Sequence, residues 1–181
     1  MKMKHEVETE LKMLLSERDF NKLVACYKPD CFIRQHNYYF VSDDVSHYAF
    51  RIRVKGNEQL FTLKEKVNGE TVEHEKLFTG RMEDDPEIVR LLDQMNVQKP
   101  YAVFGELITY RAVMETDLAE ICFDVNHYNG KTDYEIEYEI KQDHDYEAAF
   151  RAFLQKADIE FKPNKKSKYK RCLKSINHNH Q

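Results

Sequence analysis

The sequence Glu6-Val7-Glu8-Thr9-Glu10-Leu11-Lys12 alternates charged side chains with mostly uncharged ones over seven positions. In a β-strand, residues two apart point to the same face, about 6.6 to 6.8 Å from each other, so the three glutamates and the lysine would form one charged row. A helix would spread these side chains around its surface, and the β-branched Val7 and Thr9 also favour a strand. Such a row could hold a metal ion beside a phosphate group, or it could be the solvated outer face of an edge strand.

Length and composition are those of an ordinary globular protein. The chain has 181 residues, of which 41% are hydrophobic and 33% charged, and its formal net charge is -4. This length predicts one domain, residues 1–181, with a core of its own. The negative net charge argues against nucleic-acid binding through a generally basic surface, so any basic site must be local.

Cysteines, histidines and apolar runs indicate a cytoplasmic protein. The four cysteines show no CxxC spacing, and the eight histidines show no ligand spacing. We therefore expect free thiols in a reducing compartment, and histidines mostly at the surface. The sequence has no apolar run of about 20 residues and no signal peptide, which argues against membrane spanning and against export.

Periodicity and turn residues predict strands interspersed with three amphipathic helices. Ser16 and Asp85 are expected to cap the first two helices, the second with Pro86 at its first position. The helices are expected at about residues 16–27, 85–96 and 146–154. Besides the opening stretch, strands are expected at residues 31–41, 48–55, 59–66, 72–77, 101–114, 119–127 and 134–140. Two tight type I′ turns are predicted at Asn68-Gly69 and Asn129-Gly130.

The charged faces of these strands are sorted by sign. The basic pairs are Arg51 with Arg53 and Lys64 with Lys66, and the acidic sets are Glu8 with Glu10 and Glu135 with Glu137 and Glu139. A solvated face usually mixes the two signs, because like charges two residues apart repel each other. The repulsion within each row indicates that something bridges its charges.

Two arrangements of these rows follow from the pattern. About eight antiparallel strands could close into a barrel, which removes open edges and leaves room for one small ligand. The charged rows would then face inward, and the apolar rows would face outward under the helices. Alternatively, the strands form an open sheet with helices on the apolar face and water on the charged face. Periodicity favours neither arrangement.

The ordered series of charged residues resembles the CYTH, or triphosphate tunnel metalloenzyme, superfamily. Glu8-x-Glu10-x-Lys12 matches its ExExK signature, and Asn37-Tyr38-Tyr39-Phe40 is similar to the second strand of small bacterial members, although Val41 and Ser42 replace the last two residues of that motif. The rest of the series follows in family order as Arg51-x-Arg53, Lys64-x-Lys66, Arg111, Asp124, Glu135, Glu137, Glu139 and Ser167-Lys168-x-x-Arg171. The resemblance covers roughly residues 3 to 171. It implies an α+β fold in which an eight-stranded antiparallel β-barrel forms a tunnel with a charged interior, flanked by about three to four helices.

The resemblance also implies roles for these residues in metal-dependent triphosphate chemistry. Arginine and lysine can bind the negative charges of triphosphate, and Mg²⁺ or Mn²⁺ takes carboxylate oxygens together with water and phosphate oxygens. The residues assigned to substrate binding are Lys12, Arg51, Arg53, Lys64, Lys66, Arg111, Lys168 and Arg171. The assigned metal ligands are Glu8, Glu10, Asp124, Glu135, Glu137 and Glu139, with the choice among the last three left open. The assigned catalytic residues are Glu8, Glu10, Lys12 and Arg111.

The expected function is hydrolysis of a triphosphate compound by in-line attack of water, with inorganic triphosphate ahead of nucleoside or thiamine triphosphate. A class IV-type adenylate cyclase, which makes cyclic AMP from ATP, is the alternative enzyme, and a non-catalytic polyphosphate-binding module is the alternative without turnover. The expected partner is the small-molecule substrate, without nucleic acid or membrane, and the protein is expected to be a monomer or a homodimer. Six charged residues share the parity of the site rows and could merely solvate the mouth of the tunnel: Glu6, Lys55, Lys66, Glu73, Glu75 and Glu120.

Overall fold

The computed structural model describes residues 2–41, 49–97 and 99–177, and these form nine β-strands, four α-helices and one short 3₁₀-helix. The chain divides into two compact units. Unit 1 consists of Met1–Glu8, Gln35–Leu107 and Tyr169–Gln181, and unit 2 consists of Thr9–Arg34 and Ile108–Lys168. The single domain expected over residues 1–181 stays a prediction.

Unit 1 is built on strands in the order β1-β6-β5-β4-β3-β7. The strand pairs β1–β6, β5–β6, β4–β5 and β3–β4 are antiparallel, and β1 lies at the edge. The first residues of β3 and the second half of β7 belong to unit 2. The bounds of these strands are β1 Lys4–Glu8, β3 Ile33–Val41, β4 Ala49–Lys55, β5 Glu58–Val67, β6 Glu70–Phe78 and β7 Ala102–Glu115.

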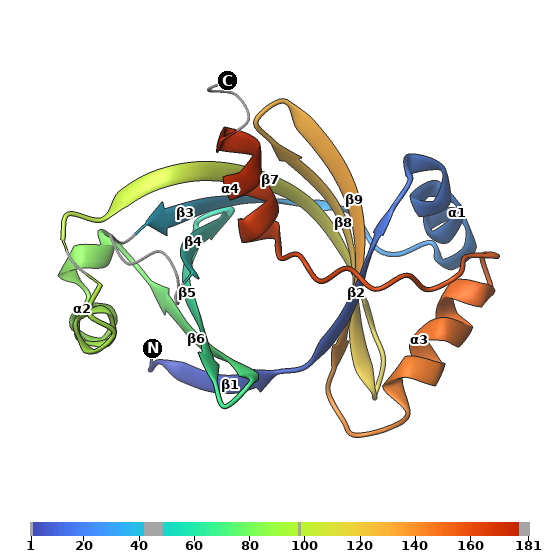
Figure 1. Ribbon diagram of the computed structural model, residues 1–181, viewed down its shortest axis with the longest axis horizontal. Coiled ribbons are helices and arrows are strands. Elements are labelled where there is room, and N and C mark those ends of the chain that lie inside the picture. Colours follow the sequence, from blue (N-terminus) through green and yellow to red (C-terminus); the bar gives the residue numbers. More distant parts are fainter. Residues whose placement is uncertain (1, 42–48, 98, 178–181) are drawn as a thin grey trace. The chain divides into compact units, whose positions relative to one another are not determined.

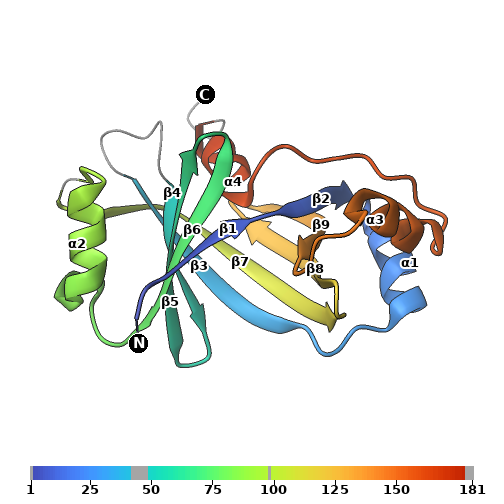
Figure 2. The ribbon, with the colours of Figure 1, turned by 90° about the horizontal axis from the view of Figure 1, so that it is seen from below.

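The apolar face of unit 1 is covered by α2, Pro86–Gln94, which follows the 3₁₀-helix η1, Met82–Asp84, and lies beside β5 and β6 (Figures 1 and 2). Asp85 caps α2 as predicted, because its Oδ1 accepts hydrogen bonds from the N–H groups of Glu87 and Ile88 over 3.0 and 3.1 Å. The strand side chains that alternate with the charged ones pack against the helix. This core includes Phe40, Phe50, Phe61, Leu63, Ile88, Leu91 and Leu92.

Unit 2 has the strand order β7-β8-β9-β2, with β2 Glu10–Leu15, β8 Ala119–Tyr128 and β9 Lys131–Ile140. The helices α1, Glu17–Tyr27, and α3, Tyr146–Gln155, pack on the apolar side of these strands (Figure 1). Ser16 caps α1 as predicted, and its Oγ accepts the N–H of Asp19 over 3.1 Å. The core includes Met13, Leu15, Phe20, Leu23, Ile121, Phe123, Ile136, Phe150 and Leu154.

A fourth helix, α4, covers Lys168–Asn177 and belongs to unit 1 except for its first residue. With α4, the described residues contain four α-helices, which agrees with the expected three to four. No helix in the described ranges combines the length and the apolar character needed to cross a membrane. The helices together with the antiparallel strand pairs confirm the expected α+β class.

The opening stretch differs from its prediction as a single strand. It is divided at Thr9, because β1 pairs with β6 whereas β2 pairs with β9. The carbonyl of Thr9 accepts the N–H of Ile140 over 3.0 Å. Each half thus hydrogen-bonds to a different neighbouring strand, and the count within the described residues is nine strands rather than eight.

Local turn chemistry follows the sequence. Asn68 and Gly69 have φ angles of 51° and 91°, and Asn129 and Gly130 have φ angles of 47° and 72°. Positive φ at both central residues is what a type I′ turn requires, and both predicted hairpins are present. The strand expected at residues 48–55 begins at Ala49, and residue 48 lies outside the described residues.

Candidate functional site

Charged side chains of unit 1 meet on the face of its strands opposite the apolar core. The β5–β6 register places Lys64 opposite Glu73. Lys64 Nζ lies 2.6 Å from both carboxylate oxygens of Glu8 and 3.4 Å from Glu73 Oε1. Arg51 Nη2 lies 3.9 Å from the same oxygen of Glu73. Glu8, Arg51, Lys64 and Glu73 form the first charged cluster, in which two cations share two carboxylates.

Arg53 is held on the same face by a buried amide. It lies opposite Asn37 in the β3–β4 register, and its Nε donates to Asn37 Oδ1 over 3.1 Å. The Nδ2 of Asn37 donates to the backbone carbonyl of Leu107 over 3.1 Å. Only 1% of Asn37 is exposed. Its two hydrogen bonds therefore fix the amide orientation and, with it, the direction of the Arg53 guanidinium.

The most buried charges of unit 2 surround Arg111 and Lys168. Arg111 donates to Asp124 from Nε to Oδ1 over 2.7 Å and from Nη2 to Oδ2 over 2.6 Å, and it also donates to Glu137. Lys168 Nζ lies 2.9 Å from Asp124 Oδ2 and 2.8 Å from Glu135 Oε2, and it contacts Glu137 as well. Asp124 and Glu135 are fully buried. Arg111, Asp124, Glu135, Glu137 and Lys168 form the second charged cluster.

The side chains of the second charged cluster stay ionised although they are buried, because opposite charges lie next to each other. Burial raises the pKa of Asp124 and Glu137, but Arg111 and Lys168 lower it by more, so both carboxyl groups titrate below their ordinary range. Burial lowers the pKa of Arg111 and Lys168, but the carboxylates, Asp124 first, raise it above the ordinary values. All four groups are therefore charged at neutral pH.

Acidic side chains converge beside the second charged cluster. Glu10, Glu137 and Glu139 each place one oxygen within 4.8 Å of the other two, and Asp124, Glu135 and Glu137 form a similar group. Lys168 contacts all three carboxylates of the latter group, so its ammonium already offsets part of their negative charge. Three carboxylates at this spacing fit a small divalent cation such as Mg²⁺, which completes its shell with water and phosphate oxygens.

The group of Glu10, Glu137 and Glu139 is the less buried of the two. Burial raises the pKa of Glu139, the charge of Arg111 lowers it, and the neighbouring carboxylates raise it again, which leaves it at about 7. Arg111 Nη1 is 3.7 Å from Glu139 Oε1, a longer separation than its contacts with Asp124. Lys12 contacts Glu10 at the other side of the group. Repulsion between these carboxylates would be relieved by a bound cation.

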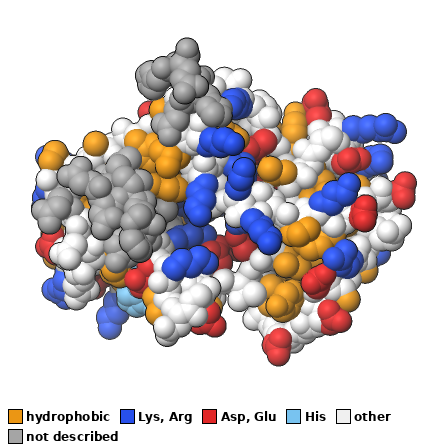
Figure 3. Space-filling view, viewed as in Figure 1, with side chains coloured by type: hydrophobic (Ala, Val, Ile, Leu, Met, Phe, Trp, Pro, Cys, Tyr) orange, Lys and Arg blue, Asp and Glu red, His pale blue; other side chains and the backbone are white. Residues whose placement is uncertain are grey.

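The predicted site residues all lie within the described residues, but their surroundings differ. Glu8, predicted as a metal ligand, contacts Lys64. Among the described residues, three groups have ligand atoms spaced for a metal ion, namely the two acidic groups above and Glu120 with Cys122 and Glu139, and Glu8 belongs to none of them. Lys66 is exposed and contacts Thr71 near the end of its hairpin. Arg171 is only 8% exposed, on α4. Figure 3 shows lysine and arginine side chains gathered on the face over α4.

Sequence reasoning missed several polar residues that orient the charged ones. For Glu73 and Glu75 the sequence left open whether they join the site or only solvate the mouth of the tunnel; Glu73 contacts two cations, and Glu75 accepts from Thr62 Oγ1 over 3.0 Å. The sequence signal for these two residues was that they alternate in step with the charged residues of the predicted site. Asn164 donates from Nδ2 to Glu135 Oε1 over 3.2 Å, and no pattern in the sequence marks it.

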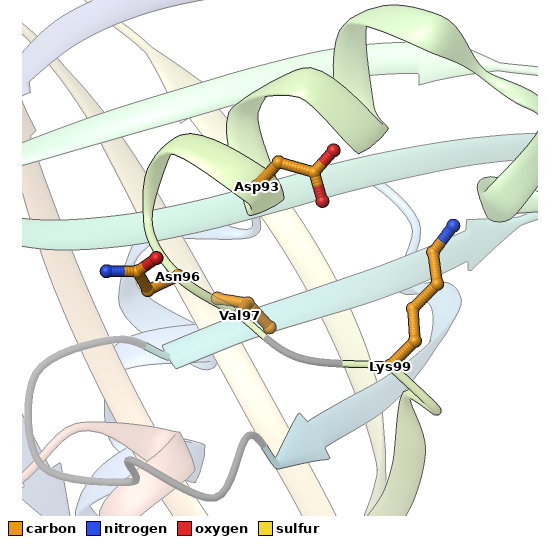
Figure 4. A pocket seen from close by; sticks show the side chains of 4 residues that line it. All are labelled: Asp93, Asn96, Val97 and Lys99. Carbon is orange, nitrogen blue, oxygen red and sulfur yellow. The ribbon is translucent and has the colours of Figure 1, made fainter.

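A separate hollow of about 280 Å³ lies at the C-terminal end of α2 (Figure 4). It contains none of the predicted site residues, and its lining has one charge of each sign. The lining residues are Asp93, Asn96, Val97 and Lys99. This hollow therefore lacks the concentration of charge that the two charged clusters show.

Comparisons with known proteins agree with the charged pattern. The family model for the CYTH domain matches residues 6–173. The Bacillus subtilis protein named "Putative triphosphatase YjbK" is 30% identical in an alignment that covers 93% of this chain and 94% of that protein. A solved structure described as a "putative adenylate cyclase" from Bacillus halodurans is 26% identical, with a TM-score of 0.82 over 92% of this chain and 97% of that one. A Hippeastrum structure described as a "putative adenylyl cyclase" with "a dominant triphosphatase activity" has a TM-score of 0.71 and 20% identity, and covers 90% of this chain and 93% of that one.

Proposed function

This chain belongs to the CYTH domain family, and we propose that it is a metal-dependent triphosphatase that hydrolyses a phosphoanhydride bond of a triphosphate compound. Inorganic triphosphate is the first candidate substrate, ahead of nucleoside and thiamine triphosphate. The name of the Bacillus subtilis relative supports this activity, and that relative spans nearly the same length. The proposal includes action in the cytoplasm, as a monomer or a homodimer.

The observation that carries the proposal is the convergence of Glu10, Glu137 and Glu139. Three carboxylates within 4.8 Å of one another repel, and Arg111 is more closely engaged with Asp124 than with Glu139. Carboxylate oxygens are the protein ligands that Mg²⁺ and Mn²⁺ prefer. We assign the metal to this group. The ion would supply charge neutralisation of the phosphate oxygens and a more acidic bound water.

The remaining residues of unit 2 hold these ligands in place. Arg111 fixes Asp124 through two parallel hydrogen bonds and reaches Glu137 with the same guanidinium. Lys168 contacts Glu137 from the other side. Because these cations are buried and charged, they hold the carboxylates in a preorganised arrangement. Lys12, which contacts Glu10 and keeps 18% of its side chain exposed, is the cation we assign to a phosphate oxygen.

Phosphate binding in unit 1 is assigned to Arg51, Arg53 and Lys64. Arg51 and Lys64 both contact Glu73, and Lys64 also contacts Glu8. Triphosphate offers several negative charges and many acceptor oxygens, which arginine can bind two at a time. When triphosphate binds, its oxygens would take the place of Glu8 and Glu73 beside these cations and would bring more negative charge.

A substrate panel with Mg²⁺ and with Mn²⁺ tests the proposal. Triphosphatase activity predicts release of orthophosphate from inorganic triphosphate, with loss of the reaction in excess chelator. The structure with a TM-score of 0.82 is described as a "putative adenylate cyclase", so ATP is included in the panel and its products are separated. Equal amounts of pyrophosphate and cyclic AMP would establish the cyclase instead. Tight binding of triphosphate without any product would leave the binding module.

A further inference from the structure

Two histidines form a contact on the face of unit 1 opposite the first charged cluster. His5 of β1 and His74 of β6 are partners in the antiparallel register, next to the pair of Glu6 and Glu73. Because successive side chains of a strand alternate between faces, His74 points away from Glu73. The two imidazole rings meet edge to face, with 4.8 Å between their centroids, and their Nδ1 atoms are 2.5 Å apart.

The partner of the second ring nitrogen determines which atom of His74 carries the proton. His74 Nε2 lies 2.8 Å from Glu65 Oε1, and a carboxylate only accepts hydrogen bonds. Nε2 is therefore the protonated nitrogen of a neutral His74, and Nδ1 has a free lone pair that points at His5 Nδ1. In the absence of an ion, a proton on His5 Nδ1 completes this contact.

We propose that His5 and His74 bind a divalent transition-metal ion, such as Zn²⁺, Ni²⁺ or Cu²⁺, through their Nδ1 atoms. A histidine that ligates a metal commonly donates its other ring N–H to a carboxylate, and Glu65 stands in that position toward His74. When the ion binds, the proton of His5 moves from Nδ1 to Nε2, so that the Nδ1 lone pairs of both rings face the ion. The two rings supply two ligand atoms, and water completes the coordination.

The geometry leaves room for this exchange. Zn²⁺–N distances of about 2.0 to 2.1 Å with tetrahedral angles place two ligand nitrogens roughly 3.4 Å apart, so the rings must separate by about 0.9 Å. His74 is only 6% exposed and held by Glu65, whereas His5 is exposed on the edge strand β1. His5 is therefore the ring that moves, and solvent gives the ion access to it.

The site differs in chemistry from the acidic groups of unit 2. Imidazole nitrogen suits Zn²⁺, Ni²⁺ and Cu²⁺, whereas Mg²⁺ selects oxygen ligands. An ion bound here connects the edge strand β1 to β6, three residues before Glu8 contacts Lys64. It would therefore anchor the strand that contributes Glu8 to the first charged cluster.

Calorimetric titration of the full chain with Zn²⁺ tests the proposal, in excess Mg²⁺ to compete for carboxylate sites. The parent protein for this test carries His178→Gln and His180→Gln, which removes the histidines of the C-terminal tail. We expect one equivalent of Zn²⁺ to bind, and His5→Gln to abolish it. Glu65→Gln should weaken binding by about 10- to 100-fold, as for other groups that orient a ligand histidine. The matched control His127→Gln removes a histidine of unit 2 that hydrogen-bonds Thr132 and packs against the ring of Tyr110, and should leave binding unchanged.

Imidazole NMR signals of the same parent protein give a second measurement that needs no substitution in the site. Zn²⁺ should shift the ring signals of His5 and His74 together, at one equivalent. Absence of a bound equivalent would overturn the proposal, as would its retention in His5→Gln. Shifts confined to other histidines would overturn it as well, whether or not His5→Gln folds.

Discussion

Arg111 and Asp124 are direct partners in the β7–β8 register, and the guanidinium of the first binds the carboxylate of the second through two hydrogen bonds of 2.7 and 2.6 Å. Both side chains are buried, with 9% and 0% of their surface exposed. Removing either side chain of such a buried ion pair would destabilise the fold, because the remaining charge would have neither water nor its partner to compensate it. Asp124 also serves Lys168, so its charge supports two buried cations.

Replacing Asp124 by asparagine should therefore cost far more stability than replacing a surface partner of arginine. Asp124→Asn keeps the shape but leaves Arg111 and Lys168 undercompensated, and we expect the free energy of unfolding to fall by about 3–5 kcal/mol. The control is Glu147→Gln, which removes the partner of Arg151 on the surface of α3 and should cost at most about 1 kcal/mol. Urea unfolding without divalent metal measures both. Similar losses for the two variants would contradict the structural role of the buried pair.

The assignment of the metal to Glu10 predicts a large effect on turnover. Glu10→Gln removes one charge of the group with Glu137 and Glu139 while keeping the side-chain volume. A metal contributes several kcal/mol to phosphoryl transfer, and each 1.36 kcal/mol is a factor of ten, so we expect turnover at limiting Mg²⁺ to fall by at least about 100-fold. Glu6→Gln, a neutralisation at an exposed position of the same stretch, should retain activity. Near-normal turnover of Glu10→Gln would refute the ligand assignment.

The packing of α4 on β7 depends on Gly105. A Cβ atom at this position would lie 3.0 Å from Cys172 Sγ and 3.2 Å from Ile176 Cδ1, so these two side chains of α4 must shift by a few tenths of an ångström to admit it. Gly105→Ala should destabilise the protein by about 1–3 kcal/mol, as overpacking does, and should raise KM because α4 also carries Arg171. Thermal unfolding and steady-state kinetics measure the two effects. Adding Cys172→Ala makes room for the new methyl group and should restore both, which a purely local backbone effect would not allow.

Acid stability should depend on the cap of α2. Burial raises the pKa of Asp85, but Lys76 at 2.7 Å and the helix N–H groups lower it by more, so it lies below the ordinary value of 3.8. Near that pH the unfolded chain binds the proton and the folded chain does not, so unfolding is favoured as the pH falls through the lowered pKa. The stabilisation is complete above the ordinary value.

Asp85→Asn keeps a capping oxygen but cannot titrate. We expect its free energy of unfolding to fall less steeply than that of the parent protein between about pH 5 and pH 3. Asp93→Asn, at an exposed position of the same helix, should keep the slope of the parent protein. Denaturant unfolding at a series of pH values gives the slopes, and identical slopes for all three proteins would exclude the contribution of Asp85.

Local features of this fold could be predicted from the sequence because neighbours in the chain determine them. Ser16 and Asp85 cap helices through N–H groups two or three residues away, and Asn68 with Gly69 closes a hairpin between adjacent strands. The alternation along each strand also assigned the charged and apolar faces correctly. Whether Glu73 faced other charges was open, because its neighbours on β5 are set by register.

The division of the opening stretch at Thr9 could not be predicted in this way. Residues 6–12 keep one alternation throughout, yet β1 pairs with β6 and β2 with β9, and this choice is made by strands more than sixty residues away. Asn164 could not be predicted for the same reason, because it belongs to the site only through its hydrogen bond to Glu135, which is distant in the sequence. Uncharged polar residues give no periodic signal of the partners they orient.

Asn37 provides the sharpest test of whether orientation of a cation matters for substrate binding. Its amide accepts from Arg53 Nε and donates to the Leu107 carbonyl, so it can position Arg53 without contacting substrate itself. Hydrogen bonds to charged groups contribute about 1.5–3 kcal/mol, and we expect Asn37→Ala to raise KM for triphosphate about tenfold with a smaller change in kcat.

If Asn37 acts through Arg53, the double variant with Arg53→Ala should bind triphosphate no worse than Arg53→Ala alone, whereas independent roles would make the two effects additive. Asn126→Ala, which removes a buried asparagine of unit 2 that contacts Thr109 and Asp133, should lower stability and leave KM unchanged. Additive effects in the cycle, or a similar rise in KM for Asn126→Ala, would show that Asn37 supports the fold rather than the direction of Arg53.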